Sequence, residues 1–213
     1  MSYRIKVALF ALSVLFFLFV LDTAYEGLKT LKRLDVVESD RDQWQRPADI
    51  LRALNLRHGS TVVDLGCGSG YFALKLSSEV DSAGTVYAVD IRRLPLMFLW
   101  VRALIRHQSN IRTVLGKADN PHLPSGAAHA VLIANTYHEF ENPVAMLDQI
   151  VQSLVPGGRL VIVDPRDTEQ GEQSCSLVEH DLRRRGFDIV TRDDRFIDQP
   201  VRGVWWLIVA RMP

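Results

Sequence analysis

The sequence predicts a three-layer α/β domain in which a mostly parallel β-sheet is covered by helices on both faces. Apolar segments of strand length alternate along the chain with segments of helical spacing. The segments 61–65, 85–90 and 159–164 are apolar almost throughout, which is typical of parallel strands that are buried on both sides. The segments that separate the strands carry apolar stripes at a helical period, as helices packed on a sheet require.

The N-terminal segment departs from this pattern. Arg4 and Lys6 precede an uncharged apolar run over residues 7–21. As a helix, this run would be roughly 22 Å long, against a hydrocarbon core of about 30 Å. We interpret it as an uncleaved membrane anchor, single-pass or monotopic. A cleavable signal peptide and a helix buried in the fold are the alternatives, although the residues that follow the run make a poor cleavage site.

We expect residues 1–33 to form the anchor helix and its linker, and residues 34–213 to form one domain. The predicted strands are 61–65, 85–90, 111–116, 127–135 and 159–164, and the predicted helices are 71–80, 94–108 and 143–155, the last ended by Pro156-Gly157-Gly158. The last part of the chain, FDIVTRDDRF and VRGVWWLIVAR around a break at Gln199-Pro200, predicts a terminal hairpin that adds an antiparallel strand.

Composition excludes some classes of function. The chain has 213 residues with 25 basic and 25 acidic side chains, so its charge gives no reason to expect a nucleic-acid partner. Cys67 and Cys175 lie far apart in the sequence, and Cys67 is inside a glycine-rich loop, so we expect free thiols in a reducing compartment. No spacing of Cys or His suits a metal site, and we expect no metal. The oligomeric state is left open.

The glycine-rich loop is the main functional signal. Residues 61–71 read TVVDLGCGSGY, with Asp64 at the strand end, and Asp90 ends the next strand. Ligands of open parallel sheets bind beyond the carboxyl ends of the strands, where Asp90 can accept hydrogen bonds from a ribose. A dinucleotide loop reads G-x-G-x-x-G, and the acid at position 64 would repel a pyrophosphate but can pair with an ammonium group. S-adenosylmethionine has a ribose, a cationic amino-acid end and no phosphate, and it fits better.

Three segments at family spacing resemble the class I S-adenosylmethionine-dependent methyltransferases: VVDLGCGSGYF, the strand-end acid of YAVDI, and LVPGGRLVIVD. RDQWQRP and NTYHEF further resemble a less characterised bacterial-type branch of that family. The resemblance covers about residues 41–211. It implies a Rossmann-like sheet of seven strands in the order 3-2-1-4-5-7-6, with the last strand antiparallel.

The resemblance also implies a set of donor-binding residues. Asp90 would bind the ribose hydroxyls and Ile91 would lie against the adenine. Many relatives carry an acid after the third strand that binds the adenine amino group; Lys117 occupies one common acid position here, so Asp119 is expected in that role. The full expected set is Asp64, Gly66, Cys67, Gly68, Gly70, Asp90, Ile91, Asp119 and Asn135, the first five on the methionine side and the last near the transferred methyl.

The residues expected to act on the acceptor follow the fourth strand. Methyl transfer needs a positioned acceptor and exclusion of water, and a hydroxyl acceptor also needs a general base. We expect His138 to be that base, with Glu139 orienting it and Tyr137 shaping the pocket. The alternative is that His138 and Glu139 only begin a loop and cap the helix at 143. Trp44 is expected either in a lid over the donor or in the core.

The helix at 94–108 is unusually apolar. An apolar stripe is expected to pack on the sheet, formed by residues 94, 97, 98, 101, 104 and 105. Leu96, Leu99 and Trp100 would remain on the flank beside several arginines, which suits a membrane interface. A buried contact with the N-terminal helix or with a dimer partner is the alternative.

These observations together predict a membrane-anchored methyltransferase. Its domain is expected on the cytosolic side, where S-adenosylmethionine is found, and its acceptor is expected to be small and lipophilic or membrane-associated. A methyltransferase of proteins or soluble metabolites, and a donor-binding subunit without catalysis, are the alternatives. A nucleotide-dependent oxidoreductase is disfavoured by the loop spacing and by Asp64.

Overall fold

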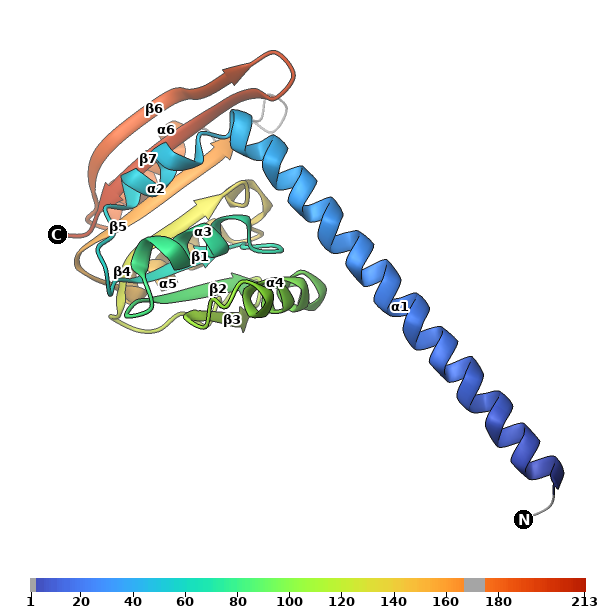
Figure 1. Cartoon of the computed structure of the whole chain (residues 1–213). Helices are drawn as coiled ribbons and strands as arrows, with labels where there is room; N and C mark the ends of the chain where they lie inside the picture. Colours follow the sequence, from blue (N-terminus) through green and yellow to red (C-terminus); the bar gives the residue numbers. More distant parts are fainter. Residues whose placement is uncertain (1–2, 167–174) are drawn as a thin grey trace. The chain divides into compact units, whose positions relative to one another are not determined.

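The computed structural model describes residues 3–166 and 175–213 and contains one seven-stranded sheet (Figure 1). The helices are α1 (Tyr3–Trp44), α2 (Pro47–Leu54), α3 (Tyr71–Val80), α4 (Arg93–Ile105), the 3-10 turn η1 (Tyr137–Glu139), α5 (Pro143–Ser153) and α6 (Cys175–Arg184). The strands are β1 (Thr61–Leu65), β2 (Thr85–Asp90), β3 (Ile111–Leu115), β4 (Ala128–Ala134), β5 (Leu154–Pro165), β6 (Asp188–Gln199) and β7 (Gly203–Arg211).

The strand order is β3-β2-β1-β4-β5-β7-β6, which confirms the expected order. Strands β1 to β5 pair in parallel, and β7 is antiparallel to both of its neighbours, β5 and β6. Several boundaries differ from the predicted ones, and the difference is largest between α5 and β5. Helix α5 ends at Ser153, and Pro156-Gly157-Gly158 lie within β5 at a register shift opposite β4, because an irregular strand start accommodates these residues.

The sheet separates two apolar layers. Alternate residues of each central strand face opposite sides, so that in β1 Val62 belongs to one core cluster and Val63 to the other. Helices α2, α3 and α4 cover the first face, and α5 and α6 cover the second. The expected three-layer arrangement is thus confirmed, and the carboxyl ends of β1, β2, β4 and β5 meet at one edge of the sheet.

Helix α4 packs with the opposite phase to the predicted one. Leu96 and Leu99 are 7% and 0% exposed, whereas Leu94 and Met97, assigned to the buried stripe, are 60% and 54% exposed. Leu104 and Ile105, also assigned to that stripe, are exposed as well. The predicted flank of Leu96, Leu99 and Trp100 is therefore wrong, since only Trp100 of the three is exposed. The helix is apolar on most sides, so its spacing allowed either phase.

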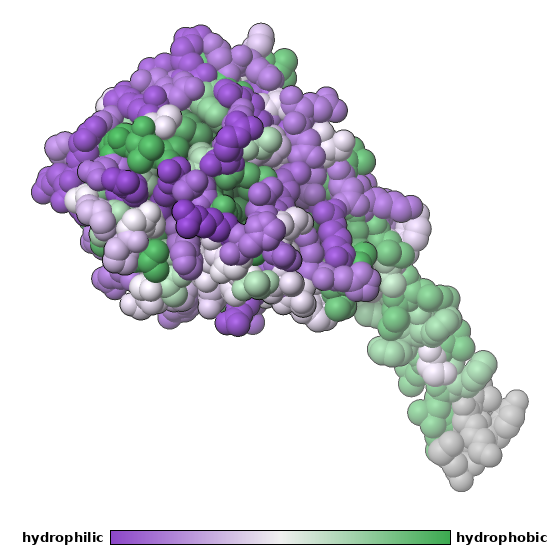
Figure 2. All heavy atoms as spheres, turned by 60° about the vertical axis from the view of Figure 1, so that its left-hand side comes forward, coloured by the Kyte–Doolittle hydropathy of each residue, from purple (hydrophilic) through white to green (hydrophobic). Residues whose placement is uncertain are grey.

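Residues Met1–Arg41 and Asp42–Pro213 form two compact units. In the first unit, α1 carries exposed apolar side chains such as Phe10, Phe16 and Phe19, and Figure 2 shows hydrophobic atoms along its coloured part. Across the described residues, however, no helix has the length and apolar character needed to cross a membrane. The predicted transmembrane anchor and membrane localisation are therefore wrong. The apolar run is shorter than a bilayer core, and charged residues follow it from Asp22 onward.

Candidate functional site

The loop between β1 and α3 turns through three glycines with left-handed backbone. Their φ angles are +78° at Gly66, +54° at Gly68 and +96° at Gly70, a region that side chains disfavour. The N–H groups of Gly66 and Cys67 both donate to the carbonyl of Val89, at 2.8 and 2.9 Å. The loop is therefore fixed against the end of β2.

Two of these glycines are enclosed and one is open. A Cβ at Gly66 would lie 2.2 Å from Thr136 Cγ2, and a Cβ at Gly70 would lie 2.2 Å from Leu99 Cδ1. A Cβ at Gly68 would meet nothing within 4 Å. Gly66 and Gly70 thus serve packing, while the backbone at Gly68 borders open space that a ligand can approach.

Asp90 ends β2 with its carboxylate turned to the glycine loop. It is 4% exposed; Oδ2 accepts from Gly68 N at 2.9 Å, and Oδ1 accepts from Arg92 N at 2.8 Å and Nε at 3.1 Å. These bonds raise the pKa of Arg92. The Arg92 side chain is 62% exposed, so it can swing away and free an acceptor site on the carboxylate. Asp90 is thus placed to bind vicinal hydroxyls beside an open backbone.

Asp64 and Cys67 lie beneath the loop. Asp64 is 2% exposed in the middle of the sheet, and Cys67 is 7% exposed. Burial raises the pKa of the Cys67 thiol, and the negative charges of Asp64 and Asp90 raise it further. The thiol therefore stays protonated and is no nucleophile at neutral pH. Cys67 and Cys175 are both free.

One residue at this loop escaped the sequence analysis. Arg102 of α4 is 3% exposed and donates from Nη1 to the Ser69 carbonyl at 2.8 Å. Leu99, one turn earlier, contacts Gly70, so α4 supports the loop through both side chains. The available signal was an arginine among the apolar residues of α4, next to Ala103 on the face that is buried.

The segment after β4 packs on the same loop. Asn135 has a φ of +60°, unusual for a residue other than glycine, and its N–H donates to the Val163 carbonyl at 2.8 Å. The next residue, Thr136, lies against Gly66, and its Oγ1 donates to the Gly66 carbonyl at 3.4 Å. Residues 135–138 are thereby held at the carboxyl edge of the sheet beside the glycine loop.

His138 is oriented by a carboxylate on a neighbouring strand. Its Nδ1 lies 3.0 Å from Oδ2 of Asp164, near the end of β5, and this carboxylate is 2% exposed. Glu139 is exposed, and Tyr137 is 2% exposed, packed against Phe140 and Trp206. Of the three predicted residues, His138 therefore faces outward with an oriented ring and Tyr137 lies in the core. Roles for Glu139 and Tyr137 stay predictions.

The two residues predicted at the adenine end are accessible. Ile91 follows Asp90 directly and is 61% exposed. Asp119 is exposed in the segment after β3, and that segment adjoins β2 because Gly116 N donates to the Asp90 carbonyl at 3.0 Å. Both residues thus lie on segments next to Asp90, and their contacts with adenine stay predictions.

Residues that precede α2 reach the first turn of α3. Asp42 accepts from the Tyr71 hydroxyl at 2.8 Å and pairs with Lys75 at 2.8 Å. Trp44 packs edge-on against Trp205, with ring centroids 5.3 Å apart, and borders the first core cluster. The core alternative for Trp44 therefore agrees with the structure.

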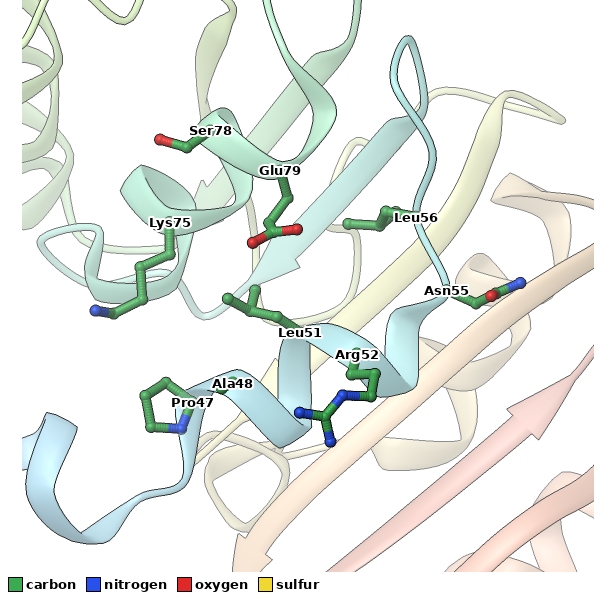
Figure 3. Close-up of a pocket in the computed structure, with 9 residues that line it drawn as sticks. All are labelled: Pro47, Ala48, Leu51, Arg52, Asn55, Leu56, Lys75, Ser78 and Glu79. Atoms are coloured by element: carbon green, nitrogen blue, oxygen red, sulfur yellow. The ribbon is translucent and has the colours of Figure 1, made fainter.

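A separate pocket of about 720 Å³ lies between α2 and α3. Figure 3 shows Leu51 and Arg52 of α2 opposite Lys75 and Glu79 of α3. None of the predicted donor or acceptor residues lines it. Within residues 3–166 and 175–213, no group of three or more His, Cys, Asp or Glu side chains could hold a metal ion.

Comparisons with known proteins agree with the geometry. Residues 62–158 match a family described as methyltransferase domain. A demethylmenaquinone methyltransferase from Geobacillus sp. (strain WCH70) is 23% identical over 136 residues, which cover 64% of this chain and 58% of that protein. A tRNA U34 carboxymethyltransferase from Alteromonas mediterranea is 31% identical over 129 residues, which cover 56% and 36%. The chain thus spans about half the length, or less, of these curated relatives.

Solved structures share the fold. The crystal structure of a SAM dependent methyltransferase from Aquifex aeolicus superposes with a TM-score of 0.71 at 20% identity, covering 86% of this chain and 98% of that one. At that identity the likeness concerns the fold, and the family match over residues 62–158 adds the domain type. The open backbone at Gly68 beside the buried Asp90 carboxylate fits a ribose-bearing ligand. Residues 62–158 are therefore similar to a methyltransferase domain, and this match together with the fold supports S-adenosyl-L-methionine as the cofactor.

Proposed function

We propose that this protein transfers a methyl group from S-adenosylmethionine to a small lipophilic acceptor. The observation that carries the proposal is the buried Asp90 carboxylate, bonded to Gly68 N at 2.9 Å, at the edge where the glycine loop leaves open space. When bound, S-adenosylmethionine supplies an activated methyl group on a sulfonium.

The donor is held by residues of three strand ends. Asp90 binds the ribose hydroxyls, in place of the exposed Arg92 side chain, and Gly68 allows the donor to approach the backbone. Asp64 contributes negative charge under the loop, which favours the cationic amino-acid end over a phosphate. Ile91 and Asp119 bind the adenine, and Asn135 lies near the methyl group.

The acceptor reaches the donor from the side of η1. His138, held beside the glycine loop, removes a proton from the acceptor where one must leave. Lipophilicity of the acceptor is supported by the similarity to demethylmenaquinone methyltransferases. A soluble-metabolite or protein acceptor is the alternative. The chain is also similar to a tRNA U34 carboxymethyltransferase, whose name does not indicate a lipophilic acceptor.

The test uses the purified full chain, methyl-labelled S-adenosylmethionine and a total cell extract. Label is counted separately in the organic, protein and polar fractions, for the wild type and for Asp90→Ala. Asp188→Ala serves as the control, because Asp188 is an exposed acid that pairs with Arg211 on the far hairpin. Donor affinity is measured in parallel by calorimetry.

We expect label in the organic fraction with the wild type and Asp188→Ala, and none with Asp90→Ala. Label confined to the protein or polar fraction would replace the lipophilic acceptor with one of the alternatives. Donor binding without any transfer would leave a non-catalytic binding subunit, and donor binding that survives Asp90→Ala unchanged would overturn the assigned donor site.

A further inference from the structure

The acceptor positions of the Asp90 carboxylate are shared between backbone and side-chain donors. An ionised carboxylate has about four such positions, roughly two on each oxygen. Backbone N–H groups take two of them: Gly68 N donates to Oδ2 at 2.9 Å, and Arg92 N donates to Oδ1 at 2.8 Å. The Arg92 guanidinium takes one more on each oxygen, with Nε 3.1 Å from Oδ1 and Nη2 3.4 Å from Oδ2.

A ribose diol needs the positions that this guanidinium occupies. Two vicinal hydroxyls can donate one hydrogen bond to each oxygen of a carboxylate, as the fork of an arginine does. The two backbone donors belong to the glycine loop and to the residue that precedes α4, so the fold holds them in place. The guanidinium of Arg92 and a ribose therefore exclude one another at Asp90.

The two partners of this ion pair differ in burial. The Asp90 side chain is 3% exposed, and that of Arg92 is 62% exposed. Water can solvate the guanidinium after it leaves, whereas the enclosed carboxylate needs donors for its oxygens in every state. Arg92 thus stabilises the carboxylate when no donor is bound. A ligand that must displace Arg92 binds more weakly than its own contacts would allow.

A second acid acts on Arg92. The hydrogen bonds and the charge of Asp90 raise the pKa of Arg92, and the charge of Glu139 raises it further. Glu139 is exposed and follows β4, whereas Arg92 follows β2, and β1 lies between these two strands in the sheet. A pair of Arg92 with Glu139 would therefore cross the glycine loop that follows β1.

We propose that Arg92 competes with the donor ribose for Asp90, and that its guanidinium pairs with Glu139 once the ribose has displaced it. This inference rests on the proposed donor site. Arg92 then sets the affinity for every ligand that carries the ribose, the methyl donor and the demethylated product alike. In the bound state, the pair of Arg92 and Glu139 closes over the ribose.

The first test measures the affinity of the full chain for S-adenosylhomocysteine by calorimetry. Arg93→Met is the matched control for Arg92→Met, because Arg93 is exposed, carries the same charge and is not among the partners of Asp90 described above. We expect Arg92→Met to bind about 3- to 10-fold more tightly than the wild type, and Arg93→Met to bind like the wild type. Arg92→Lys, which keeps the charge without the fork, should show a smaller gain. Equal affinities of Arg92→Met and the wild type would overturn the competition.

The second test determines whether the gain comes from the ribose. Adenosine and 2′,3′-dideoxyadenosine are both uncharged and differ only in the diol. Arg92→Met should bind adenosine more tightly than the wild type does, by a factor similar to that for S-adenosylhomocysteine, and should show no gain for the dideoxy compound. A gain for both compounds would show that the substitution reshaped the site, and would refute competition for Asp90.

A double-mutant cycle tests the pairing with Glu139. Glu139→Gln should weaken binding of S-adenosylhomocysteine by about 2- to 5-fold in the wild-type background, because the displaced guanidinium loses its partner. It should have no effect in the Arg92→Met background. Glu141→Gln serves as the control, since Glu141 is an exposed acid two residues further along the chain. Independent effects of the substitutions at 92 and 139 would refute this pairing.

Asp90→Ala separates the inference from the function on which it rests. If Asp90→Ala abolishes binding of S-adenosylhomocysteine while Arg92→Met binds like the wild type, the donor site stands and the competition fails. If the wild type does not bind this ligand, or if Asp90→Ala binds it equally well, the assigned donor site fails, and the competition fails with it.

Discussion

Replacing Gly66 by alanine tests the contact between the glycine loop and the turn after β4. At a φ of +78°, a side chain costs about 1–2 kcal/mol of folding free energy from backbone strain alone. The new Cβ would also lie 2.7 Å from Thr136 Cβ, an atom that no side-chain rotation can move. One of the two loops must shift, at a further cost of about 1–3 kcal/mol. We therefore expect Gly66→Ala to lower the free energy of unfolding by about 2–5 kcal/mol.

The matched control is Gly186→Ala. Gly186 has a φ of +86°, and a Cβ there meets nothing within 4 Å, so it reports the strain without the collision. Urea denaturation followed by circular dichroism measures both variants, and calorimetry measures donor binding, which only Gly66→Ala should weaken. In a double-mutant cycle with Thr136→Gly, the collision part of the loss should be recovered as a coupling of about 1–3 kcal/mol. Equal losses for the two alanine variants, with no coupling, would refute the described contact.

Three further predictions concern the packing. Leu99→Ala should lower the free energy of unfolding by about 2–5 kcal/mol in urea denaturation, while Met97→Ala on the exposed face of α4 should change it by less than about 0.5 kcal/mol; the reverse order would contradict the observed phase of the helix. Asn142→Ala removes the side-chain bond to the N–H of Ala145, the third residue of α5, at 3.0 Å, and should cost about 1 kcal/mol in the same assay. Burial raises the pKa of Cys175 to about 12 and that of Cys67 still further. A raised thiol pKa contributes its full stability below the unfolded value of about 8.5, and this stability is lost as the pH rises from there toward the folded pKa. The melting temperature should therefore fall as the pH rises above about 8.5, and it should fall less when both thiols are replaced by alanine. Rapid alkylation of both thiols in the native protein at pH 8 would contradict this last prediction.

The sheet could be predicted because its strands carry their signal locally. Residues 61–65 and 85–90 are the strands β1 and β2 that the sequence predicts, since each is a short apolar run bounded by glycine or charge. The phase of α4 could not be predicted in this way. Apolar residues lie all round that helix, and the burial of Leu99 against Gly70 and of Arg102 against Ser69 depends on contacts distant in sequence.

The site shows the same division. Asp90 can be predicted because it ends a strand near a glycine loop. The sequence predicts that the adjacent Glu139 orients His138, whereas the structure places Asp164 beside the imidazole. Asp164 is 26 residues away in the sequence and reaches His138 only because β4 and β5 are neighbours. A sequence signal was present, however, since Asp64, Asp90 and Asp164 each stand at or next to the carboxyl end of an apolar strand.

The position of β7 determines when the sheet can be completed during synthesis of the chain. β7 follows β6 in the chain but lies between β5 and β6 in the sheet. As the chain leaves the ribosome, β5 and β6 emerge before the strand that pairs with both, so the edge of β5 stays open until residues 203–211 are released. Unpaired strand edges attract other chains. Chaperone capture or co-translational aggregation should therefore concentrate in the interval between the emergence of β5 and that of β7.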